Sequence, residues 1–370
     1  MTENETRDPD RFAATLLRAS AAGLASATAR RLLTPADGGG SRAAVPGGVD
    51  GFAQWRSAAE NHIAHLAAAL AAHRPTIFED HVRWTCWACR ARGVTPEEVR
   101  ASLTALADTV REELPAETGA RVAAVITTAL DVLGEVPAEP PSALRVDSER
   151  GEVAARYLFM LLEGDRDGAL AVIDRARADG FTIPQIYSEV FLPTLAEVGR
   201  LWQLDEVHVA EEHFATATTS LAIARLYPDL PRAAACGKTI LTVAVEGDLH
   251  ELGIRIVSDF FAMDGWRVVH LGSSVPGADL RRGAVDFGAD LIAISASLVT
   301  HLGKVESLIA ELRRDPETSA IPVIVGGQAF AAAPGYGIEI GADGEASGVD
   351  DAVRTGRRLV GLDGADARPS

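Results

Sequence analysis

The hydrophobic pattern of the chain changes period after Pro228, and this change constrains the fold more than any other feature. Short runs rich in β-branched residues then alternate with segments long enough for a helix; the runs are Thr239–Val245, Arg267–Leu271, Leu291–Ser295 and Val323–Val325. Such alternation is typical of a parallel sheet covered by helices. We predict an α/β domain over residues 236–363, with Ile338–Ile340 as a weak fifth strand and Val349–Val360 as a closing helix.

Before Pro228 the apolar residues recur at intervals of three and four, which indicates amphipathic helices. The first third is predicted to be an all-α sensory domain, residues 1–134, with helices near Arg11–Leu33, Phe52–His73, Thr76–Arg92, Thr95–Leu114 and Glu117–Leu133 and a loop at Asp37–Gly40. Five or six helices over about 130 residues suit a globin-like or related bundle. The Pro-rich run Gly134–Ser142 predicts a linker over residues 135–150. Four more helices predict a four-helix bundle over residues 151–230, at Gly151–Glu163, Arg166–Asp179, Ile183–Leu201 and Val207–Leu226.

The chain is acidic, since 52 Asp and Glu against 35 Lys and Arg give a net charge of −17. Such a field repels phosphate backbones, so we expect no direct DNA binding. The three cysteines are too few for a disulfide framework, and the N-terminus lacks the pattern of a signal peptide. No apolar run reaches the roughly 18–20 residues of a membrane span. These features predict a cytoplasmic protein that is not bound to a membrane.

The first predicted strand leads into Glu246-Gly247-Asp248-Leu249-His250, and Gly253 follows three residues after the histidine. Ligands bind open parallel sheets at this carboxyl edge. Forty-one residues separate Gly253 from Ser295-Ala296-Ser297, and 28 residues separate Ser297 from Gly326-Gly327. These three elements, with their spacing, resemble the signature of cobalamin-binding domains. The resemblance implies a flavodoxin/Rossmann-like fold that holds a cobalt corrinoid.

The resemblance also implies a role for each motif residue. His250 would be the lower axial ligand of the cobalt, and Asp248 would hold its other ring nitrogen, which fixes the tautomer and raises the basicity of the ligand. A slot beside the sheet would take the nucleotide tail of the cofactor; the remaining cofactor-binding residues would be Glu246, Gly247, Leu249, Gly253, Ser295, Ser297, Gly326 and Gly327. The family commonly has Leu in place of Ser297, which leaves the contacts of the tail open. Each motif alone has another explanation: Asp248 and His250 could be a hydrogen-bonded pair that caps a loop, and Gly326-Gly327 could be an ordinary turn after a strand.

The predicted bundle contains a second motif, in which Trp202 is separated by nine residues from Glu212-His213. This pattern resembles the cap of adenosylcobalamin photoreceptors. Caps of the methionine-synthase type also place a helical bundle beside a cobalamin domain, and the Trp-x9-Glu-His pattern is what favours the photoreceptors over them. The resemblance implies that Trp202 lies over the upper corrin face and that Glu212 and His213 contact the adenosyl group or nearby cap elements. The alternative is an aromatic core residue beside an exposed Glu-His pair. His208 is expected to be solvated or to cap a helix, and Glu211 to face solvent.

The helical N-terminal third differs from the winged-helix domain of DNA-binding photoreceptors. Together with the two motifs it resembles the photocobilins, which pair cobalamin with a bilin. The segment His81–Arg90 would then line a tetrapyrrole pocket for biliverdin or a related pigment, since it concentrates Trp84, Cys86, Trp87 and Cys89. Helix packing is the alternative role of the two tryptophans. A haem ligand among His62, His65 and His73, or a zinc or redox role for the two cysteines, is a less favoured interpretation.

Two functions remain open at this level. The first is a light sensor without enzyme activity, in which photolysis of the cobalt–carbon bond of adenosylcobalamin lets the cap shift and signals to an unidentified protein partner or through homo-oligomers. The second is a corrinoid carrier that passes methyl groups between separate methyltransferases. A cobalamin-dependent mutase is disfavoured, because the chain has no segment for a (β/α)8 barrel of roughly 250 residues.

Overall fold

The computed structural model describes residues 8–34 and 51–362. The chain divides into two compact units, one comprising residues 1–141 and 203–206 and the other residues 142–202 and 207–370. The predicted loop at Asp37–Gly40 lies outside the described residues. Within the described part of the chain, no helix is both long and apolar enough to cross a membrane.

The first unit is helical, as the sequence predicts. Its elements are α1 (Pro9–Leu33), α2 (Gly51–Ala71), α3 (Pro75–Ala91), α4 (Pro96–Glu113), α5 (Ala116–Asp131) and the 3-10 turn η1 (Val132–Gly134). Three of the helices begin with proline, which fits the first turn because its missing N–H needs no partner there. Thr95 and Glu98 form a capping box that begins α4. Fully buried alanines, among them Ala13, Ala25 and Ala67, line the packing of α1 along α2.

The second unit begins with helices α6 (Glu149–Leu162), α7 (Arg166–Ala178), α8 (Ile183–Gln185), the π-helical segment η2 (Ile186–Phe191), α9 (Leu192–Gln203), α10 (Val209–Leu226) and the turn η3 (Tyr227–Asp229). The predicted helix Ile183–Leu201 is thus interrupted by a wider turn. The reason is Pro193, which has no N–H for the ladder, and the N–H of Leu192 before it reaches back five residues to Tyr187 O. The helical ranges agree with prediction, whereas their description as a four-helix bundle remains a prediction.

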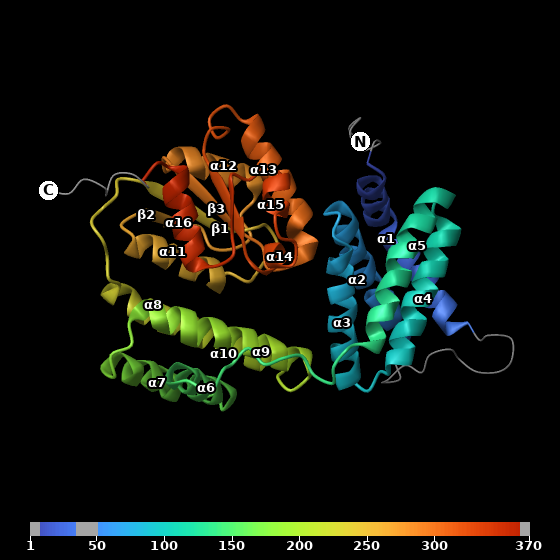
Figure 1. The fold of residues 1–370 in the computed structure, drawn as a ribbon, viewed down its shortest axis with the longest axis horizontal. Coiled ribbons are helices and arrows are strands. Elements are labelled where there is room, and N and C mark those ends of the chain that lie inside the picture. Colours follow the sequence, from blue (N-terminus) through green and yellow to red (C-terminus); the bar gives the residue numbers. More distant parts are fainter. Residues whose placement is uncertain (1–7, 35–50, 363–370) are drawn as a thin grey trace. The chain divides into compact units, whose positions relative to one another are not determined.

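A five-stranded parallel sheet follows, in the order β2-β1-β3-β4-β5. Figure 1 labels its strands β1, β2 and β3 and the helices around them. The strands are β1 (Thr239–Ala244), β2 (Arg267–His270), β3 (Leu291–Ser295), β4 (Val323–Gly326) and β5 (Gly344–Ala346). Every residue of β1 is buried, as expected for a central strand covered on both faces. The order is that of flavodoxin-like sheets, and the chain reverses its direction of travel between β1 and β3. The predicted parallel α/β domain is confirmed.

The predicted fifth strand, Ile338–Ile340, is wrong, because this segment belongs to the short helix α15 (Tyr336–Glu339) and its C-cap. Gly335 enters that helix with φ of +80°, and the carboxylate of Glu345 accepts hydrogen bonds from the N–H groups of Gly335 and Gly337, both at 2.8 Å. The true edge strand β5 consists of Gly, Glu and Ala. Gly344 is needed there, since a Cβ would lie 2.5 Å from the Thr355 side chain. The strand therefore carries no apolar signal.

Helices cover both faces of the sheet, as right-handed crossovers require. They are α11 (Leu252–Met263), α12 (Gly277–Asp286), α13 (Leu302–Arg314), α14 (Gln328–Ala331) and α16 (Val349–Leu359), and the 3-10 turn η4 (Val299–His301) precedes α13. One face of α11 packs on the sheet, and its residues Leu252, Ile256 and Phe260 join the core formed by α6–α10. A buried hydrogen bond from Tyr187 Oη to Asp259 Oδ2, 2.9 Å long, also joins η2 to α11.

Candidate functional site

The site lies where the loops after β1 and β3 meet. These strands are neighbours in parallel register, with Ala244 opposite Ser295, so their carboxyl ends open onto the same edge. The next backbone contacts continue the pairing, because Val245 N donates to Ser295 O at 2.9 Å. β1 and β3 also flank the point where the strand order reverses, which is where parallel α/β sheets bind ligands. The topology therefore singles out this loop pair.

Asp248 and His250 are joined by a side-chain hydrogen bond at the centre of this loop pair. Asp248 is only 1% exposed, while the His250 side chain is 62% exposed. His250 Nδ1 donates to Asp248 Oδ1 at 2.8 Å, and the backbone N of His250 donates to the same oxygen at 3.1 Å. Because Nδ1 carries the proton, Nε2 keeps its lone pair. The pair therefore presents an oriented ligand nitrogen on an exposed ring.

The loop after β3 also forms a hydrogen bond with Asp248. Ser297 N donates to Asp248 Oδ2 at 2.6 Å, so the serine acts here through its backbone. Burial alone would raise the pKa of Asp248, but the hydrogen bonds from His250 and Ser297 outweigh it and lower the pKa to about 2. The hydrogen bond to Asp248 raises the pKa of His250, against the opposing effect of burial. Asp248 is thus a permanent carboxylate at neutral pH.

A second histidine, His301 of η4, also faces this carboxylate and is not among the predicted site residues. Its Nδ1 lies 3.6 Å from Asp248 Oδ2, and its side chain is 12% exposed. Burial lowers the pKa of His301, while the charge of Asp248 opposes this shift. Its position in the loop after β3, four residues beyond Ser297, is the sequence signal that could have indicated it.

The glycines of the motif differ in what they do. A Cβ on Gly253 would meet no atom within 4 Å, so open space lies beside the start of α11. Gly327 has φ of +99°, and a Cβ there would lie 2.5 Å from Ala296 O and 3.0 Å from Ser295 Oγ. A Cβ on Gly326 would lie 3.0 Å from Ala346 O. Gly253 therefore borders open space, whereas a side chain would be strained at Gly327 and tight at Gly326.

The other loop residues surround the histidine. Leu249 is 78% exposed, an unusual degree for leucine, and stands between Asp248 and His250. Glu246 is exposed, and its carbonyl accepts a hydrogen bond of 3.0 Å from Lys304 Nζ. Gly247 has φ of +83° and its N–H donates to Ser274 Oγ at 3.1 Å. The loop is thus held at Gly247 while an apolar side chain and an imidazole stay accessible.

The residues of the second motif lie at the ends of neighbouring helices along the chain. Trp202 is part of the last turn of α9, and Glu212 and His213 belong to the first turns of α10. Glu212 Oε2 accepts from His213 Nδ1 at 2.7 Å, and Glu212 Oε1 accepts from Thr216 Oγ1 at 2.9 Å. The charge of Glu212 is the smallest contribution to the raised pKa of His250, after the effects of Asp248 and of burial.

His208 is a capping residue, one of its two expected roles. It begins α10 and forms a capping box with Glu211, whose side chain accepts from His208 N at 2.9 Å. Glu211 therefore also serves the helix end. Neither residue is engaged with His250 by any hydrogen bond of the described chain.

The first unit holds a buried histidine pair. His62 and His81 share a hydrogen bond of 2.8 Å between Nδ1 and Nε2, and His65 stacks on His81 with ring centroids 3.8 Å apart. Burial, reinforced by His65, lowers the pKa of His62 to about 4. Among residues 8–34 and 51–362, no group of three or more His, Cys, Asp or Glu side chains is arranged to hold a metal ion.

The segment His81–Arg90, which was predicted to line a tetrapyrrole pocket, is partly buried and partly exposed. His81 and Cys86 are buried, whereas Trp84 is partly exposed and Trp87 Nε1 donates to Pro137 O at 2.9 Å. Burial raises the pKa of Cys86, and raises that of Cys89 to about 11, so both thiols are protonated at neutral pH.

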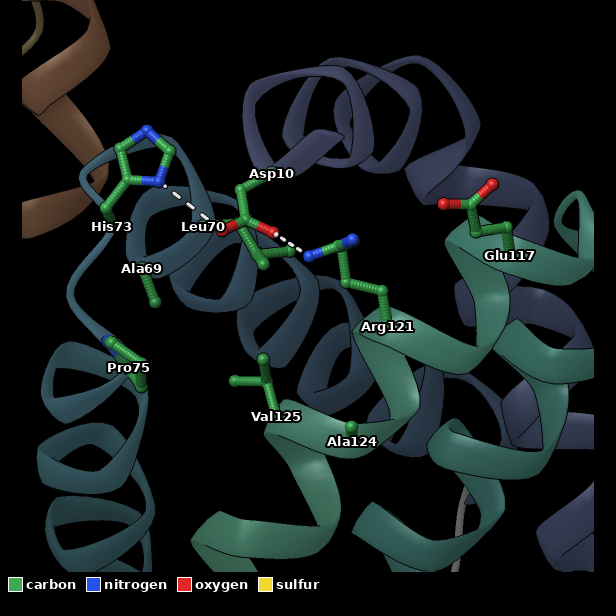
Figure 2. A pocket seen from close by; sticks show the side chains of 9 residues that line it. All are labelled: Asp10, Ala69, Leu70, His73, Pro75, Glu117, Arg121, Ala124 and Val125. Atoms are coloured by element: carbon green, nitrogen blue, oxygen red, sulfur yellow. Dashed lines mark hydrogen bonds and ion pairs between the residues drawn. The ribbon is translucent and has the colours of Figure 1, made fainter. Parts of the chain in front are cut away.

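A cavity of about 500 Å³ lies elsewhere in the first unit, between α1, α2 and α5 (Figure 2). Asp10 lies between His73 and Arg121, at 3.3 Å from His73 Nδ1 and 3.2 Å from the Arg121 guanidinium. Apolar side chains, including Leu70 and Val125, form its floor. Residues 81–90 do not line this cavity.

Comparison with known proteins assigns the second unit. Residues 238–354 match a family model described as B12 binding domain, and residues 153–227 match a second model with the same description. The chain is 27% identical over 206 residues to a corrinoid protein of Desulfitobacterium hafniense (strain Y51), which covers 54% of this chain and 94% of that protein. It is 28% identical over 197 residues to the dimethylamine corrinoid protein of Methanosarcina barkeri, covering 53% and 91%.

A solved structure is similar over a comparable share of the chain. The monomethylamine corrinoid protein of Methanosarcina barkeri superposes with a TM-score of 0.51 at 21% identity, covering 56% of this chain and 98% of that one. This similarity shows the fold. The family matches make residues 153–227 and 238–354 B12-binding domains of a cobalamin-binding family, as the Asp248-x-His250 motif predicts.

Proposed function

We propose that His250 Nε2 is the lower axial ligand of a cobalt corrinoid bound on the β1–β3 edge of the sheet. The observation that carries this proposal is the pairing of a buried, fully charged Asp248 with an exposed His250, 2.8 Å apart. A ligating histidine generally donates its other N–H to a carboxylate, which fixes the ring and raises its basicity. The corrin ring supplies the equatorial nitrogens itself, so one oriented imidazole from the protein suffices.

The remaining motif residues fit the rest of such a cofactor. The open space beside Gly253 would take part of the nucleotide tail, because no protein atom lies within 4 Å of a Cβ built there. Ser295 and Ser297 offer hydroxyl groups on the neighbouring strand end. Leu249 would cover the corrin ring with its exposed side chain. When bound, the corrinoid supplies a cobalt centre that can carry an alkyl group.

We propose that the whole protein acts as a corrinoid carrier for separate methyltransferases. The support comes from the relatives, which are named as corrinoid proteins and match over more than 90% of their own length. In this role the chain is not itself a catalyst. Its residues hold the corrinoid, orient His250 and leave the upper face to a partner enzyme.

A second candidate, an adenosylcobalamin light sensor, is favoured by one specific observation. Glu212 belongs to the Trp202-x9-Glu212-His213 motif and is close enough to affect the pKa of His250. This placement suits a cap whose residues respond to an adenosyl group above the corrin ring. Biliverdin or another tetrapyrrole in the first unit, a protein signalling partner and a homo-oligomer belong to this candidate.

The first experiment measures corrinoid binding and ligation. The purified chain is titrated with hydroxocobalamin, and the reduced cobalt(II) form is examined by electron paramagnetic resonance after labelling with ¹⁵N-histidine. If a histidine is the ligand, labelling should turn the nitrogen splitting of the cobalt(II) spectrum from a triplet into a doublet. This ¹⁵N doublet should be absent in His250→Ala. His73→Ala is the matched control, because His73 also contacts carboxylates, at Asp8 and Asp10. A triplet that persists after labelling would contradict the assignment of His250.

The second experiment separates the two functions. Adenosylcobalamin and methylcobalamin are bound to the wild type and to Trp202→Ala, and spectra are taken in the dark and after brief illumination, with and without biliverdin. A sensor should prefer adenosylcobalamin, lose this preference in Trp202→Ala and change its spectrum and oligomeric state in light. A carrier should bind both forms alike and accept a methyl group from a methyltransferase. Light-driven conversion coupled to an oligomer change would displace the carrier role.

A further inference from the structure

The loop between α9 and α10 belongs to the first unit, although the helices on either side belong to the second. Residues 203–206 form part of the compact unit of residues 1–141, whereas Trp202 and Val207, which flank them, are part of the other unit. The chain therefore passes between the units at three places, and two of these flank the loop. One linker is enough to join two units, so the loop needs a separate explanation.

The end of α3 and the residue after it hold this loop. The Arg92 guanidinium donates to Gln203 O at 3.1 Å and forms an ion pair with Asp205 at 3.0 Å. The same guanidinium donates to Ala88 O at 2.9 Å, which ties it to α3. The side-chain amide of Gln203 donates to Trp84 O at 3.2 Å, and Gln203 is only 7% exposed. Buried amides are generally hydrogen-bonded in this way, so the loop is docked on α3 and not merely near it.

The two ends of the loop are tied to each other. Val207 N donates to Leu201 O at 3.3 Å, a contact within the second unit. Asp205, between these ends, has φ of +62°, in the left-handed region that Asp enters more readily than most residues. Because the last turn of α9 and the start of α10 are joined by a backbone hydrogen bond, a shift of either helix end displaces the loop.

The linker is held by the same two helices. Trp87 Nε1 of α3 donates to Pro137 O at 2.9 Å, within the first unit. Glu197 of α9 is 4% exposed and accepts from Ala143 N at 2.8 Å and Ser142 Oγ at 3.0 Å, within the second unit. The linker and the loop therefore both run between α3 and α9, so the chain connects these two helices twice.

The helices that the loop joins belong to the corrinoid-binding half of the chain. Residues 153–227 match a B12 binding domain model. Trp202 lies in the last turn of α9, and Glu212, whose charge contributes to the pKa of His250, lies near the start of α10. A ligand that contacts these helix ends favours one of their positions over others, and through them one position of the loop.

We propose that Arg92 and residues 203–206 couple the corrinoid site to α3, so that corrinoid binding makes the C-terminal half of α3 more resistant to local opening. The contacts of Arg92 with Gln203 and Asp205 carry this coupling. It rests on the proposed corrinoid binding by the second unit. It gives the helical first unit a means to respond to the cofactor of the second unit without a pigment of its own.

The test is hydrogen–deuterium exchange of the full chain with and without hydroxocobalamin, whose binding is followed by absorbance in the same samples. Arg92→Ala removes every contact of the guanidinium. Asp205→Asn removes the ion pair and keeps a residue that tolerates the left-handed region. Arg100→Ala is the matched control, because Arg100 also donates to a backbone carbonyl of the first unit, Leu130 O at 3.2 Å. Thermal unfolding of the apo-proteins checks that each variant folds.

In the wild type, hydroxocobalamin should slow the exchange of residues 84–91 about fivefold or more, the lower end of typical coupling between two sites. Arg92→Ala should abolish this effect and Asp205→Asn should weaken it, whereas Arg100→Ala should retain it. The affinity for hydroxocobalamin should stay unchanged in all three, because local opening of α3 is a minor state of the folded protein.

The possible failures are distinguishable. Unchanged exchange of residues 84–91 in a wild type that binds hydroxocobalamin would overturn the coupling and leave the proposed function intact. An undiminished effect in Arg92→Ala would overturn the role of the loop contacts. Failure of the wild type to bind hydroxocobalamin would instead overturn the proposed function, and the inference with it.

A readout on the apo-protein is independent of the corrinoid. Arg92→Ala should speed the exchange of residues 203–208, since the loop loses its contacts with the guanidinium, and Arg100→Ala should leave it unchanged. Equal exchange of residues 203–208 in Arg92→Ala and the wild type would overturn the inference, because Arg92 would then not hold the loop.

Discussion

Gly253→Ala separates what the fold needs from what a cofactor needs. Gly253 is the second residue of α11, and it is not among the glycines with positive φ. A Cβ at this position would touch no atom within 4 Å. The backbone therefore gives no reason for glycine, and alanine should stabilise the helix by about 0.5–1 kcal/mol. The apo-protein should melt at an unchanged or slightly higher temperature.

The same methyl group should weaken cobalamin binding. If the nucleotide tail fills the space beside Gly253, the added carbon overpacks it, at a cost of about 1–3 kcal/mol. At about 1.4 kcal/mol per tenfold change, this corresponds to a roughly 5- to 150-fold weaker affinity. Cobinamide has no nucleotide tail, so its affinity should stay unchanged. The ratio of the two affinities is the quantity that reports on the slot.

The assay is a titration of both corrinoids by absorbance, together with thermal unfolding of the apo-protein. Gly23→Ala is the matched control, since Gly23 lies in α1, is exposed and has open space around its Cβ position. It should stabilise the helix and leave both affinities unchanged. Equal cobalamin affinity in Gly253→Ala and the wild type would refute the placement of the tail, and a marked loss of stability would refute the open space itself.

Three further results are expected from the geometry. Gly327→Ala should lower the free energy of unfolding by about 1–3 kcal/mol in urea, because φ of +99° and a Cβ 2.5 Å from Ala296 O strain any side chain; an unchanged midpoint would contradict this. Burial holds the pKa of His62 near 4 in the folded state, below its ordinary value of 6.5. The unfolded state therefore takes up the proton first, and His62 should lower the stability by up to about 3 kcal/mol as the pH drops from 6.5 to 4, seen as faster hydrogen exchange in α2 beyond the intrinsic pH effect. The loss should be smaller in His62→Phe but not abolished, because burial also lowers the pKa values of His65 and His81. Tyr187→Phe leaves the buried Asp259 without its hydroxyl donor and should cost about 1–3 kcal/mol by calorimetry, a loss that Asp259→Asn combined with Tyr187→Phe should partly restore.

The parallel sheet and the loop pair at its carboxyl edge could be predicted because their signals are local. Apolar β-branched runs mark β1 and β3, and the motif residues follow these strands directly. Once two parallel strands are neighbours, their carboxyl ends meet, so the loop of Asp248 and the loop of Ser297 come together without further information. The 41 residues between Gly253 and Ser295 span one strand and two helices, which is the length such a crossover needs.

The edge strand β5 could not be predicted, because its residue types depend on tertiary contacts and not on a local apolar pattern. Gly344 must be small under Thr355, and Glu345 turns its carboxylate to the start of α15. The apolar pair Ile338 and Ile340 has strand-like composition, yet the cap at Gly335 directs this segment into a helix. Tertiary packing outweighed local propensity at both places. The π turn before Pro193 had a local signal in the proline, whereas the hydrogen bond from Tyr187 in this turn to Asp259 joins residues 72 positions apart and has no local signal.

His301 shows why a motif gives the members of a site but not its extent. Asp248 was recognisable because it stands two residues before His250, a spacing that lets its carboxylate accept both the ring and the backbone N–H. His301, 53 positions after Asp248, has no such local relation, and the β1–β3 pairing brings its Nδ1 to 3.6 Å from Asp248 Oδ2. That oxygen already accepts from Ser297 N, so the motif accounts for both oxygens and only the fold shows that a further side chain stands beside the second. A substitution at His301 therefore tests how far the surroundings of Asp248, beyond the motif itself, affect the ring of His250.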